Sequence, residues 1–178
     1  MHLKKIWLLL PLLVASNLSM ADTAQGAHHQ DAGHAHGSDD ASEYAAIGQP
    51  GMASQATRTL TIEMSDGMRF TPAEIQVKKN ETVRFVVKNA GTLKHEMVLG
   101  TTAELKSHYA LMLKNPQMEH ADPNMITLPP GQTGEIIWTF SKAGIVDFAC
   151  LQPGHFDAGM KGRVNVVGAP ASQATHQH

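Results

Sequence analysis

The stretch TLTIEMSDGMRFTPAEIQVKKNETVRFVV, residues 59–87, carries the pattern that decides the fold class. Apolar and polar side chains alternate through three runs, and a period of two residues indicates strands with one buried face. Turn-forming pairs separate the runs, namely Asp66-Gly67 and Lys79-Asn80. The apolar positions are Leu60, Ile62, Met64, Ile75, Val77, Val83, Phe85 and Val87. The stretch therefore predicts three short strands in close succession.

The same pattern continues toward the C-terminus. Further strand-like runs cover residues 93–101, 134–140, 144–151 and 162–167, and glycine- or proline-containing turns separate them. Short strands at this spacing, without alternating helices, are typical of a sandwich of two packed sheets. We therefore predict an all-β, antiparallel β-sandwich of about seven to eight strands.

One segment breaks the alternation and predicts a short helix over residues 102–114. Its apolar side chains recur at spacings of four and three residues, at Leu105, Tyr109 and Met112. Thr101 followed by Glu104 fits a capping box, in which two side chains satisfy the first backbone N–H groups of a helix. Pro116 supplies the stop. We expect this helix to be inserted between two strands.

The N-terminus has the features of a secretory leader. Lys4 and Lys5 precede an apolar run too short to span a bilayer, and small residues lead up to Ala21. We therefore predict a signal peptide over residues 1–21, cleavage after Ala21, and a periplasmic protein without membrane insertion. The whole chain has a formal net charge of −2, which becomes more negative when the leader is lost. This balance argues against a nucleic-acid partner, and we expect a monomer.

Composition divides the rest of the chain into three parts. Residues 22–57 consist mainly of Ala, Gly, Ser, Asp, Gln and His, and cannot bury enough apolar surface to offset the entropy lost on ordering. We predict a disordered, histidine-rich arm there and a flexible tail over residues 169–178. Residues 58–168 have regular hydrophobic patterning and form one domain that is large enough for its own core.

The stretch FACLQPGHFDAGM, residues 148–160, contains Cys150, the one cysteine of the chain. Small exported domains usually use cysteines in pairs, so a lone thiol needs an explanation. A buried inert thiol is one alternative, and an intermolecular disulfide in a metal-free structural protein is another. However, His155 and Met160 follow Cys150 at regular five-residue intervals. A thiolate, an imidazole and a thioether are three of the donors of a blue-copper site, which needs one more histidine.

His95 is the best candidate for the missing imidazole. It lies in the strand-like run LKHEMVLG, directly after a glycine-containing turn, where a strand can hold it rigidly. His108 lies on the predicted helix and His120 in a polar loop, so both are weaker candidates for this ligand. A hydrogen-bonded core histidine is the alternative reading of His95.

The order His95, Cys150, His155 and Met160, just before a final strand, resembles the cupredoxin family of type 1 copper proteins, and the loop spacing is most similar to rusticyanin and auracyanin. The resemblance implies a Greek-key sandwich, one copper ion held by these four residues and electron transfer through His155. Four protein ligands leave no open position for a substrate, so we expect that the protein is not an enzyme. Electron carriers of the family usually have Asn or Ser after the first histidine, whereas this chain has Glu96.

Two functions remain open at this point. The chain also resembles the His-rich periplasmic cupredoxins associated with copper tolerance, so we expect copper homeostasis, and a dedicated electron carrier is the alternative. Additional copper binding is expected from the histidines of the arm and the soft donors of a later loop. The alternative for the arm is solvated low-complexity sequence, and for the loop methionines that fill core gaps. The candidate secondary ligands are His28, His29, His34, His36, Met118, His120 and Met125.

Overall fold

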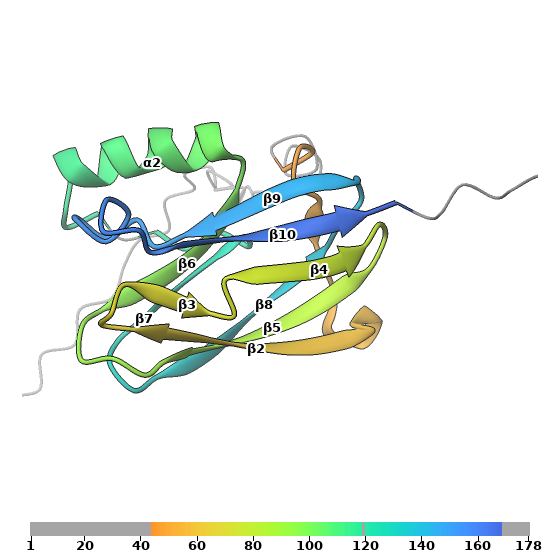
Figure 1. Cartoon of the computed structure of the whole chain (residues 1–178), viewed down its shortest axis with the longest axis horizontal. Helices are drawn as coiled ribbons and strands as arrows, with labels where there is room; N and C mark the ends of the chain where they lie inside the picture. Colours follow the sequence, from red (N-terminus) through yellow and green to blue (C-terminus); the bar gives the residue numbers. More distant parts are fainter. Residues whose placement is uncertain (1–43, 119, 169–178) are drawn as a thin grey trace, which may run out of the picture. The chain divides into compact units, whose positions relative to one another are not determined.

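The computed structural model describes residues 44–118 and 120–168, which form two five-stranded sheets and one α-helix (Figure 1). The predicted signal peptide, residues 22–43 of the predicted arm and the tail after residue 168 lie outside the described residues. The same holds for four of the candidate copper ligands, His28, His29, His34 and His36.

The first sheet has the strand order β1-β8-β5-β2-β3. β2 and β5 are parallel, and the other neighbours are antiparallel. A short 3-10 helix, η1 (Ala53–Gln55), precedes β2. The strands are β1 (Gln49–Pro50), β2 (Arg58–Ser65), β3 (Arg69–Thr71), β5 (Thr82–Asn89) and β8 (Thr133–Thr139).

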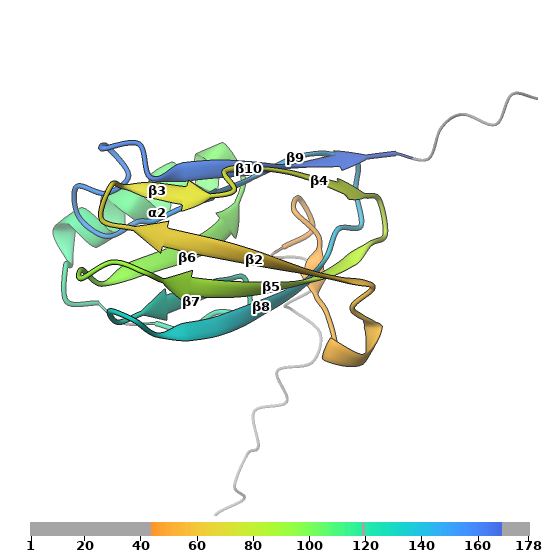
Figure 2. The same cartoon turned by 60° about the horizontal axis from the view of Figure 1, so that its bottom comes forward.

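The second sheet has the order β4-β10-β9-β6-β7 and faces the first, as the two views in Figures 1 and 2 show. Here β4 and β10 are parallel, and the remaining pairs are antiparallel. The strands are β4 (Glu74–Lys78), β6 (His95–Gly100), β7 (Met125–Leu128), β9 (Gly144–Ala149) and β10 (Lys161–Val167).

The predicted sandwich is confirmed, with two differences. The described residues contain ten strands rather than seven or eight, because β1, β3 and β7 are too short to show an alternating pattern. The sheets are also mixed rather than antiparallel throughout. After the hairpin formed by β2 and β3, the chain crosses into the second sheet as β4 and returns as β5 beside β2, which makes that pair parallel. Alternation reveals which face of a strand is buried, not the direction of its partner.

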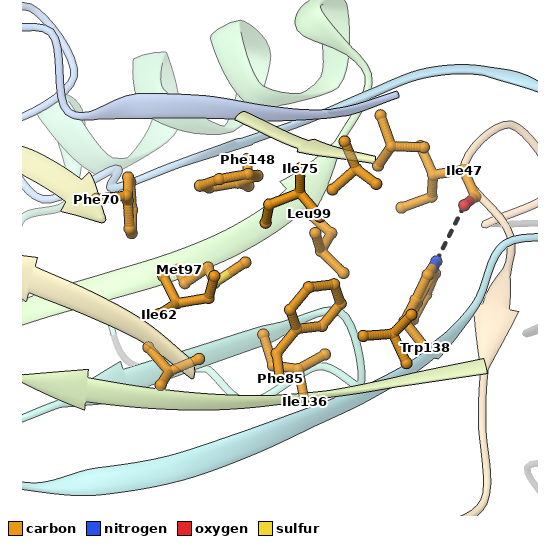
Figure 3. Close-up of a cluster of buried hydrophobic side chains, with 14 of the residues drawn as sticks. Ile47, Ile62, Phe70, Ile75, Phe85, Met97, Leu99, Ile136, Trp138 and Phe148 are labelled. Atoms are coloured by element: carbon orange, nitrogen blue, oxygen red, sulfur yellow. Dashed lines mark hydrogen bonds between the residues drawn. The ribbon is translucent and has the colours of Figure 1, made fainter. Parts of the chain in front are cut away.

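The core lies between the two sheets (Figure 3). The buried side chains of β2 and β5 form one side of the core, and Phe148 and Ile75 of the opposite sheet pack against them. Phe70 meets Phe148 edge to face, with ring centroids 5.0 Å apart. Such pairs add about 0.5–1.5 kcal/mol beyond simple burial of apolar area. The apolar residues predicted from period two therefore form one continuous interior.

The sandwich begins before the predicted boundary at residue 57. Tyr44 and Ile47 are buried, and Trp138 of β8 donates a 3.0 Å hydrogen bond from Nε1 to the carbonyl oxygen of Ile47 (Figure 3). Tyr44 also packs edge to face on the Trp138 ring. Residues 44–57 therefore belong to the fold and not to the arm. The average composition of residues 22–57 is polar, so it did not reveal the two large buried side chains, Tyr44 and Ile47.

The predicted helix is α2 (Thr102–Lys114), and its capping box forms as expected. The Thr101 hydroxyl accepts from the Glu104 N–H, and the Glu104 carboxylate accepts from the Thr101 N–H. Leu105, Tyr109 and Met112 are buried against the outer face of the second sheet, on the side away from β2, β5 and β8 (Figure 1). Among the described residues, no helix is long and apolar enough to cross a membrane.

Candidate metal centre

The ends of three strands of the second sheet lie close together at one end of the sandwich. His95 is the first residue of β6, Cys150 directly follows β9, and Met160 directly precedes β10. Because β9 pairs antiparallel with both β6 and β10, these positions become neighbours in space. The backbone N–H of Cys150 donates to the carbonyl oxygen of Met160 at 3.1 Å. The register of the sheet thus gathers residues that lie far apart in the sequence.

The side chains of His95, Cys150 and His155 form a compact donor group. Their ligand atoms all lie within 4.8 Å of one another. His155 Nδ1 is 3.3 Å from Cys150 Sγ and 3.2 Å from His95 Nδ1. His95 and Cys150 are completely buried, and His155 is half-buried. The structure therefore brings together three of the four predicted ligands, and Met160 lies fully buried beside them.

Asp66 orients the His95 ring. His95 Nε2 lies 3.0 Å from Asp66 Oδ1, and a carboxylate can only accept at this contact, so Nε2 carries the proton. This leaves Nδ1 without a proton and directed toward Cys150 and His155. A carboxylate behind a histidine is the usual way in which a protein sets the tautomer and basicity of a metal-binding imidazole.

Asp66 is itself held firmly in the turn after β2. Its carboxylate accepts from the N–H and hydroxyl of Thr92, both at 2.7 Å, and from the N–H of Leu93. The hydrogen bonds from Thr92 keep the pKa of Asp66 well below its usual range. Gly91 leaves room for this arrangement, because a Cβ there would overlap with the Asp66 carboxylate. Asp66 therefore stays ionised at any ordinary pH.

We expect Asp66→Ala to weaken copper binding about 10- to 100-fold, the range seen when a carboxylate behind a metal-binding histidine is removed. The His95 ring loses its proton acceptor and can turn or change tautomer. The measurement is a competition titration of copper with a chromophoric chelator. Glu135→Ala, which removes a surface carboxylate paired with Arg84, is the matched control. Equal affinities of the two variants would contradict the role of Asp66.

The Cys150 thiol lies in an environment that resists ionisation. Burial raises its pKa to about 12, and the 3.4 Å contact with the Glu96 backbone N–H only partly offsets that effect. Without a metal the thiol keeps its proton at neutral pH, and a bound cation must displace it. Burial and the neighbouring His95 lower the pKa of His155. That histidine is therefore mainly neutral, which is the form that binds metals.

Glu96 joins the two segments that carry the predicted ligands. Its side chain is buried, and it accepts from the N–H of Leu151 at 2.8 Å and from Gln152 Nε2 at 3.2 Å. The Thr127 hydroxyl of β7 contacts the same carboxylate. Glu96 therefore ties the start of β6 to the segment after Cys150.

The loop between Cys150 and Met160 is also tied to α2. The Tyr109 hydroxyl donates to Asp157 at 2.8 Å and accepts from the Gly154 N–H at 3.0 Å. The Tyr109 ring stacks on Phe156 at a centroid distance of 5.0 Å. The sequence pattern predicted that Tyr109 lies on the buried face of the helix. It did not indicate the hydrogen bonds between Tyr109 and the loop. It also missed Asp66, which its Asp-Gly context marked only as a turn residue.

Three of the secondary candidates are described, and they lie outside this donor group, in the segment from the end of α2 to the start of β7. Met118, His120 and Met125 line a cavity of about 380 Å³, and Glu96 lines it as well. The His108 ring packs against that of His120, with centroids 4.6 Å apart. Burial and the neighbouring His120 lower the pKa of His108. Sequence reasoning considered His108 only as a weaker alternative to His95, and the structure places it with the other set.

The family model described as "Copper binding proteins, plastocyanin/azurin family" matches residues 56–167. This range covers β2 to β10 and α2, and with them both segments that carry the donor group.

Curated relatives and solved structures are also similar to this chain. The copper-resistant cuproprotein CopI of Rubrivivax gelatinosus is 50% identical over 164 residues, which cover 89% of this chain and 97% of that protein. CopI of Pseudomonas aeruginosa is 38% identical, over 68% of this chain and 82% of its own length. A dithionite-reduced auracyanin of Roseiflexus castenholzii superposes with a TM-score of 0.53 at 25% identity, over 65% of this chain and 99% of its own.

Proposed function

This chain belongs to the plastocyanin/azurin family of copper-binding proteins, and from that premise we propose that His95, Cys150, His155 and Met160 hold one copper ion in a type 1 centre that serves copper tolerance in the periplasm. The observation that carries the proposal is the convergence of one sulfur and two ring nitrogens within 4.8 Å at a single end of the sandwich.

The donor set fits copper better than other common metals. A thiolate and two imidazoles in one plane, with a weak thioether along the axis, are the ligands of blue-copper sites. A structural zinc site would be expected to use four strong ligands from Cys and His. Bound copper would supply reversible one-electron chemistry, and it would also account for a buried thiol that is hard to ionise without a metal. Asp66 and Glu96 then keep His95 and the loop after Cys150 in position.

We propose that the protein is not an enzyme. A catalytic metal site keeps an open coordination position for its substrate, whereas four protein donors fill this one. His95, Cys150 and Met160 are fully buried, so a substrate has no direct access to them. His155 is half-buried and provides an edge through which an electron could pass to a docked partner.

The role in copper tolerance is supported by the relatives and by the leader. Both CopI proteins are named for copper resistance, and the similarity to the Rubrivivax protein extends over nearly the whole length of both chains. The N-terminal leader directs the protein to the periplasm. An electron carrier between periplasmic proteins is the second candidate, and the half-buried edge of His155 favours it.

A gene deletion separates the two candidates. We expect the deletion strain to grow poorly under copper stress while respiratory electron flow stays normal, and the wild-type gene to restore growth. A copy with Cys150→Ser should fail to restore it, and a copy with Glu135→Ala should succeed. Normal growth on copper together with impaired electron flow would instead assign the protein to electron transfer.

A further inference from the structure

A second set of imidazole and thioether donors lies in the segment from α2 to the start of β7. His108 is on α2, His120 lies in the loop that follows, and Met125 is the first residue of β7. Met118 belongs to the same loop. None of these residues contributes to the group formed by His95, Cys150 and His155.

The ring nitrogens of His120 are available to bind a ligand. Both of its ring nitrogens are buried, and neither finds a hydrogen-bond partner among the described residues. A buried polar group without a partner costs about 1–3 kcal/mol, so proteins rarely keep one without a reason. The His108 ring stands beside it, tilted by 41°. Two adjacent imidazoles, one of them wholly unsatisfied, provide nitrogen donors that a cation can use.

The methionines bring thioethers to the same place. Met118, Met125 and His120 line the cavity of about 380 Å³, while Met125 and His108 line a neighbouring cavity of about 180 Å³. Met125 is therefore shared between the surroundings of both histidines. It is 9% exposed, whereas Met118 is 43% exposed and lies nearer to solvent.

We propose that His108, His120 and Met125 bind a Cu(I) ion, with Met118 at the solvent side of the site. Imidazole and thioether donors without a thiolate suit Cu(I) and not the hard divalent cations. Burial and the neighbouring His120 lower the pKa of His108, and the carboxylates of Glu96 and Asp122 offset this only in part. This site would have no visible colour, because the d shell of Cu(I) is filled.

Glu96 borders both this site and the proposed type 1 centre. Its side chain lines the cavity that His120 also lines, and its backbone N–H contacts Cys150 Sγ. The two sites thus have one residue of β6 as a common neighbour. A protein that handles copper could hold a reduced ion at this position without using the centre that carries electrons.

The test uses the full-length mature chain with Cys150→Ser and ¹³C-methyl-labelled methionines. Cu(I) is added without oxygen, and the methyl signals are followed by NMR. We expect the Met125 methyl signal to shift and saturate as the site fills. His120→Ala and His108→Ala should each weaken this response at least about tenfold, since loss of outer partners alone costs 10–100-fold. Met52→Leu, which changes an exposed methionine, is the matched control.

Two outcomes would overturn the proposal: a Met125 signal that does not move, or a titration that His120→Ala leaves unchanged. The Met160 signal reports the type 1 site separately, so failure at one site is not mistaken for failure at the other. The Cu(II) colour of His120→Ala in the background that retains Cys150 verifies that the variant folds.

Discussion

Cys150→Ser is expected to abolish the visible thiolate-to-copper charge-transfer band completely. The band needs a sulfur ligand, and Cys150 is the only cysteine of the chain. Serine also removes the soft anionic donor, so copper affinity should fall steeply. The measurement is the absorption spectrum of the copper-loaded protein, together with a copper titration. A band of undiminished strength in the variant would refute ligation by Cys150.

Loss of colour must be separated from loss of fold. Serine is close in size to cysteine, and its hydroxyl can accept from the Glu96 N–H that now contacts Sγ. We therefore expect an unchanged far-ultraviolet circular dichroism spectrum. Met160→Leu is the companion variant, because it removes the weak thioether and keeps the thiolate. It should retain a band that is shifted in wavelength.

Deletion of residues 22–57 is expected to lower the free energy of unfolding by about 4 kcal/mol. The deletion removes Tyr44 and Ile47, each worth roughly 1.5–3 kcal/mol of apolar burial as an upper estimate. The hydrogen bond from Trp138 to Ile47 contributes about 1 kcal/mol more. This loss is a large part of the 5–15 kcal/mol typical of a domain. Urea unfolding of the metal-free protein measures it.

The matched control is deletion of residues 22–43, which leaves Tyr44 and Ile47 in place. Trp138 is the one tryptophan outside the predicted leader, so its fluorescence reports directly on this corner of the core. Unfolding midpoints that agree between the two deletions would contradict the packing role of residues 44–57.

The shorter deletion also tests the histidines of the arm. It removes His28, His29, His34 and His36 and keeps the buried Tyr44 and Ile47. We expect the protein to bind fewer copper ions and to keep its coloured centre. Equal copper content with and without residues 22–43 would remove the arm from any account of copper binding.

Much of the fold and of the candidate site could be predicted from the sequence. Period two marked the strands that supply the core, and the Thr101 and Glu104 pair marked the start of α2, because both are local patterns. Parallel pairing of β2 with β5 had no such signal, since it depends on where the chain returns after crossing to the other sheet. The same limit hid Asp66, which lies in a turn and meets His95 only because the sandwich brings the two loops together.

Residue types and their spacing were enough to predict the donor chemistry and the fold class. A lone cysteine, a histidine and a methionine stand at fixed intervals before a final strand, and alternating segments can each bury one face. Only the folded structure shows that Asp66 orients His95, that Glu96 bridges two segments, that Tyr44 and Ile47 belong to the core, and that His108 lies beside His120. The physical reason is that residue types set which bonds are possible, whereas strand register and packing set which atoms meet, and those contacts join parts of the chain that no local pattern connects.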